Sequence, residues 1–163
     1  DGTQGDEITN NVRTIKSIPL QLTGNVPSDF EIRGEIVLPH LAFNKLNEKR
    51  LEEDLPLFAN PRNCASGSLK LQDSNEVARR GLDAYLYYVL PEGVLSSHHS
   101  SAIAAAGSLG FKVPLVQNKF IATCSGIDDI MSFINYWDVE RKKLPFDIDG
   151  IVIKVDSYEA QQD

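Results

Sequence analysis

Asp147-Ile148-Asp149-Gly150-Ile151-Val152-Ile153-Lys154-Val155-Asp156 has a clear period-two pattern of apolar and polar residues. An Asp-x-Asp-Gly sequence before the alternation predicts a tight turn, because glycine and aspartate favour turn conformations. The alternation after it predicts a β-strand with two different faces. The face expected to be buried is apolar and consists of Ile151, Ile153 and Val155. The other face consists of Val152, Lys154 and Asp156.

Val152 and Lys154 suggest a use for the second face of this predicted strand. Two residues apart on a strand, they are separated by roughly 6–7 Å, since each residue advances about 3.3 Å. A flat aromatic ring fits against the valine, and an anionic group fits beside the ammonium. The alternative is a core strand whose single lysine extends to solvent. The ten residues alone leave both interpretations open.

Length and composition indicate a globular chain of one domain or two subdomains. The chain has 163 residues, of which 42% are hydrophobic and 24% charged. No apolar run approaches the roughly 18–20 residues of a membrane span, and the polar start predicts no signal peptide. Cys64 and Cys124 have neither disulfide-framework nor metal-ligand spacing, so we expect a cytoplasmic protein. The net charge of −7 argues against a free-standing nucleic-acid binder, although a local basic patch remains compatible with it.

The remaining periodicities predict strands and helices that do not alternate strictly. Several connections resemble hairpins, so the expected class is α+β with antiparallel sheets flanked by helices. Strands are predicted near 19–22 and over 30–38, 82–90 and 119–123. Helices are predicted over 6–15 and 39–53 (Leu41 and Leu46 inward), from 97 or 100 to 107 or 110, and over 128–143. Residues 54–75 are predicted to be irregular.

Two further motifs carry groups suited to a nucleotide. Arg33-Gly34-Glu35 places a glycine inside a strand, which indicates the close approach of a ligand or another backbone. Glu35 has the chemistry to accept hydrogen bonds from a ribose, but a solvated charged face is the alternative. The segment 60–70 has two cations and no acid, which suits an anion bound by Arg62 and main-chain N–H groups. A purely structural loop is the alternative there.

In combination, these motifs resemble the adenylation (nucleotidyltransferase) domain of bacterial NAD-dependent DNA ligases over essentially the whole chain. The Asn-Pro-Arg-Asn run makes the resemblance specific. The matching segments are residues 1–5 with 8–9, 13–15 and 18–19; Arg33-Gly34-Glu35-Ile36; residues 58–63 with 65–69; and residues 149–154.

The resemblance implies a nucleotidyltransferase fold, as in DNA ligases and mRNA capping enzymes, and roles for particular residues. Glu35 would bind the ribose of the adenylate, Tyr87 and Val152 would enclose the adenine, and Lys154 would contact the α-phosphate. Arg62 and Arg141 would lie near the nucleotide phosphates or the DNA nick, and Asp149 would orient the site. It also implies NAD and Mg²⁺, although no residue is assigned as a metal ligand. The implied partners are nicked double-stranded DNA and the remaining ligase domains of the same chain, with no membrane.

Enzymes of this family join a 5′-phosphate to a 3′-hydroxyl in three steps. A lysine attacks NAD and releases nicotinamide mononucleotide, AMP moves to the DNA 5′-phosphate, and the 3′-hydroxyl displaces it. The attacking lysine lies in a Lys-x-Asp-Gly motif, which is absent from these 163 residues. The resemblance therefore predicts that residues 1–163 are the C-terminal portion of the domain, truncated at both ends and inactive alone. Lys70 stands where the family often has arginine, which keeps the charge but loses bidentate geometry.

Two other functions remain open at this point. The chain is compatible with another nucleotidyltransferase, such as an ATP-dependent ligase or a capping enzyme, although the segment 60–69 argues against it. A non-catalytic nucleotide-binding or DNA-clamping module is the second alternative. Use of ATP rather than NAD would distinguish another nucleotidyltransferase from an NAD-dependent ligase. A Lys-x-Asp-Gly motif upstream of these residues would exclude a non-catalytic module.

Overall fold

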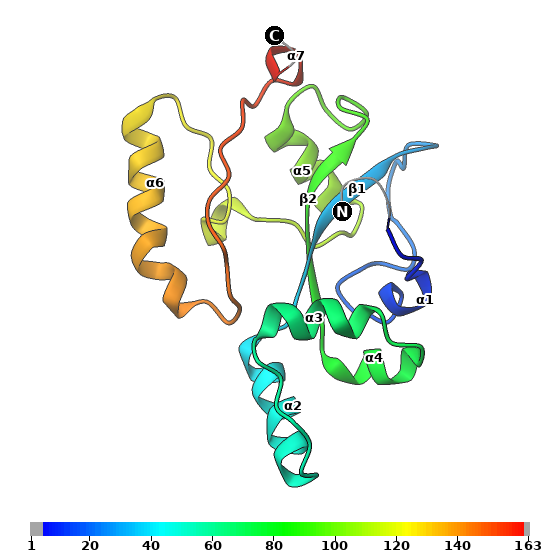
Figure 1. Cartoon of the computed structure of the whole chain (residues 1–163). Helices are drawn as coiled ribbons and strands as arrows, with labels where there is room; N and C mark the ends of the chain where they lie inside the picture. Colours follow the sequence, from blue (N-terminus) through cyan, green and yellow to red (C-terminus); the bar gives the residue numbers. More distant parts are fainter. Residues whose placement is uncertain (1–4, 162–163) are drawn as a thin grey trace. The chain divides into compact units, whose positions relative to one another are not determined.

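A computed structural model of the chain describes residues 5–161, so residues 1–4 of the predicted N-terminal loop lie outside the described part (Figure 1). Helices accompany a two-stranded antiparallel sheet, which confirms the α+β class. The strands are β1 (Glu31–Val37) and β2 (Asp83–Leu90). The helices are α1 (Thr9–Val12), α2 (His40–Glu52), α3 (Pro61–Leu69), α4 (Ser74–Arg80), α5 (His99–Ser108), α6 (Ile127–Glu140) and α7 (Tyr158–Gln161). Two 3₁₀ helices are η1 (Val116–Asn118) and η2 (Arg141–Lys143).

The chain divides into two compact units. Unit 1 comprises Asp1–Leu20, Ile36–Ala84 and Pro145–Asp147. Unit 2 comprises Gln21–Glu35, Tyr85–Leu144 and Ile148–Asp163. The boundary passes through both strands, because β1 changes unit after Glu35 and β2 after Ala84.

Unit 1 contains α2, α3 and α4, which contact one another (Figure 1). Helix α2 follows Pro39, and its less exposed residues are Ala42, Phe43, Leu46, Asn47 and Arg50. These positions repeat every three or four residues and so share one face of a helix. The prediction that Leu41 lies inward was wrong, since its side chain is 74% exposed. Leu41 and Leu46 are five residues apart, which turns them to different sides of a helix.

Residues 54–75 are not irregular throughout, because α3 and the start of α4 lie within them. The Asn60 side chain accepts a hydrogen bond from the Asn63 N–H at 2.8 Å, and Pro61 is the first helical residue. Asp73 caps α4 in the same way, through the Asn75 N–H at 3.0 Å. Asn, Pro and Asp are typical of loops but also of the first positions of helices. The prediction failed because these residues begin helices here.

Unit 2 contains α5 and α6 and a core that includes Val89, Ile103, Ala106 and Trp137. The predicted helix ending near residue 107 is confirmed as α5, and the helix predicted over 128–143 is confirmed as α6 followed by η2. The apolar stripe of α6 leads to Trp137, which is buried. The Trp137 indole N–H donates to the Lys119 carbonyl at 2.7 Å.

Two short predicted strands are not formed. Residues 19–22 and 119–123 have no strand conformation, and among residues 5–161 the two strands pair with each other. Lys119 has a φ of 58°, which lies in the left-handed region and is incompatible with a strand. The carbonyl of Lys119 bonds to Trp137 instead of to a neighbouring strand.

The strand predicted over residues 151–156 is also absent. An isolated antiparallel bridge between His98 and Ser157 follows this segment. The face predicted to be buried is largely exposed, since Ile153 is 61% and Val155 57% accessible. A strand needs a hydrogen-bonding neighbour, and among residues 5–161 the sheet consists of β1 and β2 and does not include this segment. The periodicity identified two sides of an extended segment but supplied no partner strand.

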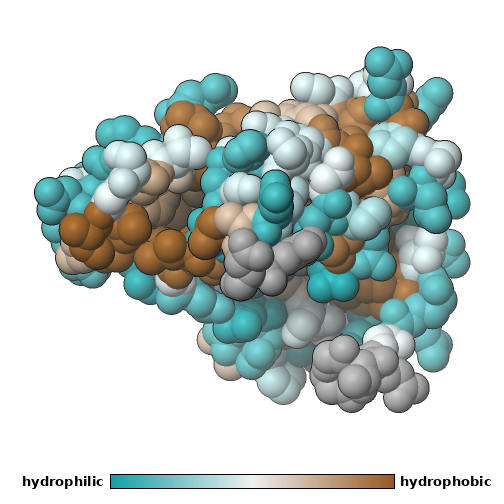
Figure 2. Space-filling model, turned by 90° about the horizontal axis from the view of Figure 1, so that it is seen from above, coloured by the Kyte–Doolittle hydropathy of each residue, from teal (hydrophilic) through white to brown (hydrophobic). Residues whose placement is uncertain are grey.

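Apolar side chains reach the surface in several places and are interspersed with hydrophilic residues (Figure 2). Large exposed apolar residues include Val116, Ile127 and Val152. In the part of the chain that the structure describes, no helix has both the length and the apolar character needed to cross a membrane.

Candidate nucleotide-binding site

Gly34 of β1 lies directly against the backbone of β2. A Cβ atom at this position would lie 2.1 Å from the Tyr85 carbonyl oxygen and 2.8 Å from the Leu86 Cα. Real Cβ atoms do not approach backbone this closely, so glycine is required at this position. The prediction of a close approach at Gly34 is confirmed, and the approaching group is another backbone. The next residue, Glu35, is exposed.

Glu35 remains available to a ligand, although a basic residue lies nearby in sequence. Arg33 pairs with Glu31, with 3.2 Å between Nη2 and Oε2. Among residues 5–161, the side chain of Glu35 has no hydrogen bond or ion pair. A carboxylate in this state can accept two hydrogen bonds from the hydroxyls of a ribose. The role of Glu35 in binding a ribose stays a prediction.

Tyr87 and Val152 present apolar surface to solvent in unit 2. Tyr87 on β2 is 44% exposed, and Val152 in the extended segment is 78% exposed. An exposed aromatic ring and an exposed valine are surfaces against which a flat base packs favourably. Their enclosure of adenine stays a prediction.

Lys154 contacts a residue that the sequence analysis did not identify. Its Nζ lies 4.5 Å from the centroid of the Tyr88 ring, within the range of a cation–π interaction. Tyr88 follows Tyr87 on β2, and successive strand residues point to opposite faces. The Tyr-Tyr pair was a signal that two aromatic faces were available. Nothing in the pattern of residues indicates which of the two rings Lys154 contacts.

Tyr88 belongs to a cluster of aromatic side chains in unit 2. Its ring centroid lies 5.3 Å from that of His99 and 6.4 Å from that of Tyr158. The Tyr88 hydroxyl donates to Glu92 Oε1 at 2.7 Å. This hydrogen bond, and then burial, raise the pKa of Tyr88 to about 12, so the phenol remains neutral near neutral pH.

The surroundings of His99 also favour its neutral form. Burial lowers the pKa of His99, the positive charge of Lys154 lowers it further, and Asp156 acts in the opposite direction. A lowered pKa favours the uncharged imidazole. The Tyr88 ring on which the Lys154 ammonium lies is therefore uncharged.

Asp156 anchors the chain two residues after Lys154. Its carboxylate accepts hydrogen bonds from the Ser100 N–H at 2.8 Å and from the Ser100 hydroxyl at 2.9 Å. The Asp156 carbonyl accepts another from the His99 N–H at 2.8 Å. A carboxylate at the first turn of α5 satisfies free N–H groups and the helix dipole. The contacts of Asp156 therefore fix the backbone close to Lys154.

Arg141 holds the backbone at the other end of the same segment. Its Nη2 donates to the Ile148 carbonyl at 3.1 Å, immediately before Asp149. Both Arg141 and Asp149 are exposed. Their predicted places near the phosphates and in orienting the site stay predictions.

Arg62 lies in unit 1, on the exposed face of α3. Arg62, Ser66 and Lys70 are spaced by four residues and are all exposed, so they follow one side of the helix. Lys70 lies 3.9 Å from the Asp6 carboxylate. The two cations expected in an irregular loop are thus presented by a helix and its C-terminal cap.

The opposite face of α3 is tied to its surroundings. The Asn11 side chain donates to the Leu69 carbonyl at 2.8 Å and to the Leu71 carbonyl at 2.7 Å. Ser68 is fully buried, and its hydroxyl donates to the Cys64 carbonyl at 2.6 Å and accepts from Arg80 Nη1 at 3.0 Å. These contacts position α3 and, with it, Arg62.

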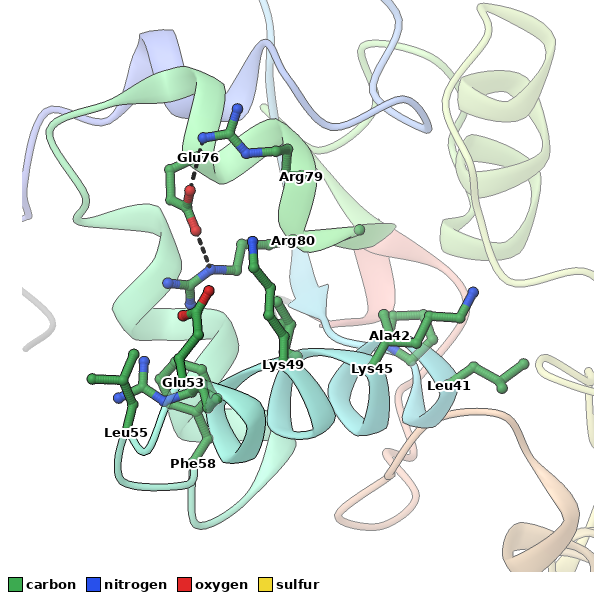
Figure 3. Close-up of a pocket in the computed structure, with 14 residues that line it drawn as sticks. Leu41, Ala42, Lys45, Lys49, Glu53, Leu55, Phe58, Glu76, Arg79 and Arg80 are labelled. Carbon is green, nitrogen blue, oxygen red and sulfur yellow. Dashed lines mark hydrogen bonds and ion pairs between the residues drawn. The ribbon is translucent and has the colours of Figure 1, made fainter.

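Arg80 also lines a groove of about 750 Å³ between α2, α4 and the loop before α3 (Figure 3). The guanidinium groups of Arg50 and Arg80 lie 4.2 and 5.1 Å from the centroid of the Phe58 ring. Glu76 pairs with Arg79 at 2.8 Å and with Arg80 at 3.5 Å, as the dashed lines show. Because Arg80 is joined to Ser68, Glu76 and Phe58, we assign it a structural role in supporting α3.

The two arginines on Glu76 provide a matched test of this role. Arg80→Ala is expected to lower the unfolding free energy of unit 1 by about 1–3 kcal/mol, because the side chain is 12% exposed and its removal takes away the donor to the buried Ser68 hydroxyl. Arg79→Ala is expected to change little, since that pair lies at the surface. Unfolding of the full-length protein in urea, detected by protease cleavage within unit 1, measures the stability of both variants. Equal stability of the two variants would contradict the role of Arg80.

A family model and individual proteins of similar sequence both relate this chain to DNA ligases. The family model of the NAD-dependent DNA ligase adenylation domain matches residues 1–163. Proteins named DNA ligase are similar to the chain: one from Parabacteroides distasonis is 51% identical and one from Phocaeicola vulgatus 50%, each over 99% of the chain. One from Flavobacterium johnsoniae is 48% identical over 100% of the chain. The chain spans 24% of the length of each of these relatives. The chain belongs to the NAD-dependent DNA ligase adenylation domain family.

Proposed function

We propose that the chain supplies the adenylate-binding part of an NAD-dependent DNA ligase. The longer protein would seal nicks between a 5′-phosphate and a 3′-hydroxyl through a lysyl-AMP and then a DNA-adenylate intermediate. Its biological setting would be replication, repair and recombination of DNA in the bacterial cytoplasm. The 163 residues contain no Lys-x-Asp-Gly sequence. In this proposal the attacking lysine belongs to another part of the longer protein, and residues 1–163 alone are inactive.

The observation that carries the proposal is the environment of Lys154. Its ammonium lies on the face of the neutral Tyr88 ring, and within residues 5–161 it forms no ion pair with a carboxylate. The charge of Lys154 is therefore not cancelled by an acidic partner. An exposed cation in this state suits a phosphate, because preorganised positive charge stabilises the charge on a transferring phosphoryl group.

The other residues in unit 2 have chemistry that complements this cation. Glu35 would accept hydrogen bonds from the ribose, and Tyr87 and Val152 would pack against the adenine. Arg141 would lie near the phosphates or the nick, as would Arg62 of unit 1, and Asp149 would orient neighbouring groups. Exposure of Glu35, Tyr87 and Val152 supports these assignments, since each side chain is accessible to a ligand.

Magnesium is part of the chemistry proposed for the longer protein. Residues 5–161 contain no group of three or more His, Cys, Asp and Glu side chains arranged to hold a metal ion. Mg²⁺ commonly keeps several waters and binds through substrate phosphates with one or two carboxylates. The described residues do not provide a metal site of their own, and we assign no step to the ion through them.

The proposed partner is nicked double-stranded DNA. Binding to duplex DNA depends strongly on contacts between cations and phosphates, and this chain has a net charge of −7. Most of the attraction would therefore come from the remaining ligase domains of the same protein, with Arg62 and Lys70 as local contributors.

Nick sealing by the full-length protein tests the proposed function. We expect a nicked duplex to be sealed with NAD, with release of nicotinamide mononucleotide, and not with ATP. Sealing with ATP alone would instead support another nucleotidyltransferase. Absence of sealing and of protein adenylation with either nucleotide would support a non-catalytic binding module.

A further inference from the structure

The contact between Lys154 and Tyr88 has two properties that matter for a phosphate-binding lysine. An aromatic ring attracts an ammonium group through its quadrupole and therefore favours one position of that group. A ring carries no net charge, so the full positive charge of the lysine remains available to an anion. A carboxylate in the same place would form an ion pair and compete with the anion for the N–H donors.

The Tyr88 ring is held in place by its neighbours. Its hydroxyl donates to Glu92 at 2.7 Å, and its ring lies 5.3 Å from that of His99. His99 in turn lies 6.2 Å from the ring of Tyr158, a residue that is 4% exposed. A side chain restrained in this way loses little conformational entropy when it orients a partner. Tyr88 is thus a fixed surface rather than a mobile one.

The backbone that carries Lys154 is restrained on its C-terminal side. Asp156 accepts two hydrogen bonds from Ser100 and a third, to its carbonyl, from His99. His99 therefore contacts both parts of the arrangement: its N–H holds the chain after Lys154, and its ring packs on Tyr88. The Lys154 side chain is then directed both by its own backbone and by the ring on which it lies.

We propose that Tyr88 is a positioning residue for Lys154, holding its ammonium toward the adenylate phosphate without neutralising its charge. This inference rests on the proposed function, in which Lys154 contacts the α-phosphate. It assigns to Tyr88 a role that differs from that of Tyr87, which would pack against the base. Tyr88 acts through the lysine and makes no contact with the substrate itself.

Single-turnover adenylyl transfer from NAD to the full-length protein tests the inference. Tyr88→Leu removes the ring face and is expected to slow transfer by about 3- to 30-fold, the loss that corresponds to one cation–π contact. Tyr88→Phe keeps the ring and is expected to recover most of that loss. A rate for Tyr88→Leu equal to that of the wild type would overturn the inference, as would a rate for Tyr88→Phe as low as that of Tyr88→Leu.

A double-mutant comparison separates positioning from a general effect on folding. Lys154→Met removes the group on which Tyr88 acts, so Tyr88→Leu is expected to cause no further loss in that background. If the two losses multiply, Tyr88 acts independently of Lys154 and the inference fails. If Lys154→Met alone has no effect, the proposed function of Lys154 fails instead.

Tyr136 provides a matched control in the same unit. The Nζ of Lys119 lies 4.4 Å from the centroid of the Tyr136 ring, so Tyr136→Leu removes a contact of the same kind that does not involve Lys154. This variant is expected to keep the wild-type rate of transfer. Should Tyr88→Leu fold poorly, Tyr88→Trp supplies a second variant with a larger ring and a stronger cation–π interaction. Its rate is expected to exceed that of a folded variant without a ring, Tyr88→Met; equal rates would contradict the inference.

Discussion

Lys154→Met in the full-length protein is expected to slow adenylyl transfer from NAD by about 100- to 1000-fold, the range found when one donor to a developing oxyanion is removed. The lysine forms no ion pair with a carboxylate within residues 5–161, so its whole charge would serve the phosphate. The effect is expected mainly in the maximal rate rather than in the KM for NAD, because negative charge on the phosphoryl oxygens is stabilised most in the transition state. Rapid-quench measurement of the adenylated protein gives both quantities.

Lys112→Met is the control for this experiment. The Nζ of Lys112 lies 4.7 Å from the centroid of the Tyr85 ring, so this variant also loses a lysine that lies on a tyrosine. It is expected to transfer AMP at the wild-type rate. If Lys154→Met also has the wild-type rate, the lysine is structural and does not act on the phosphate.

Gly34→Ala is expected to destabilise the region around β1 and β2 by about 3 kcal/mol, at the upper end of the usual cost of overpacking. The added Cβ would lie 2.1 Å from the Tyr85 carbonyl oxygen, and a backbone atom cannot move away as easily as the end of a side chain. The strands must separate locally to accommodate the methyl group. Pulse proteolysis of the full-length protein across a urea series measures the change.

Gly67→Ala is the matched control for the glycine substitution. Gly67 lies within α3, and a Cβ atom there would meet nothing within 4 Å. Alanine in an exposed helix is about 1 kcal/mol more favourable than glycine, so this variant is expected to be as stable as the wild type or slightly more stable. A Gly34→Ala protein that unfolds at the wild-type urea concentration would show that β1 and β2 do not approach as described.

Side-chain periodicity correctly predicted the strands and the helix in which it marks the face that packs against the core. The alternation over 30–38 and the aromatic run over 82–90 correspond to β1 and β2. The stripe that ends at Trp137 corresponds to α6. In each case the side-chain period agrees with the conformation that buries those side chains.

Two of the failed predictions show how one sequence pattern is compatible with different structures. Asn60 and Pro61 are typical of loops, but here they cap and begin α3. Residues 151–155 have the period of a strand, but a strand also requires a neighbour, and no periodicity identifies one. Secondary structure that depends on distant contacts is therefore the part that the sequence could not supply.

In the candidate site, too, some residues could be assigned from the sequence, whereas others depend on contacts between distant segments. Glu35, Tyr87, Val152 and Lys154 were assigned from sequence patterns and from the resemblance; all are exposed residues of unit 2, and their roles stay predictions. Tyr88 was missed because its contact with Lys154 joins two segments that are far apart in sequence. The supporting roles of Ser68 and Asp156 were missed for the same reason, since each depends on a hydrogen bond to a residue in another segment, Arg80 for Ser68 and Ser100 for Asp156.

Hydrogen exchange of the full-length protein, measured by mass spectrometry with and without bound AMP, tests most directly whether this chain contains the adenylate site. We predict that AMP slows exchange in peptides covering β1, β2 and the segment 149–156, which carry Glu35, Tyr87, Val152 and Lys154. The same protection should decrease in Lys154→Met at a fixed AMP concentration. Protection confined to regions outside residues 5–161 would contradict the assignment of the site.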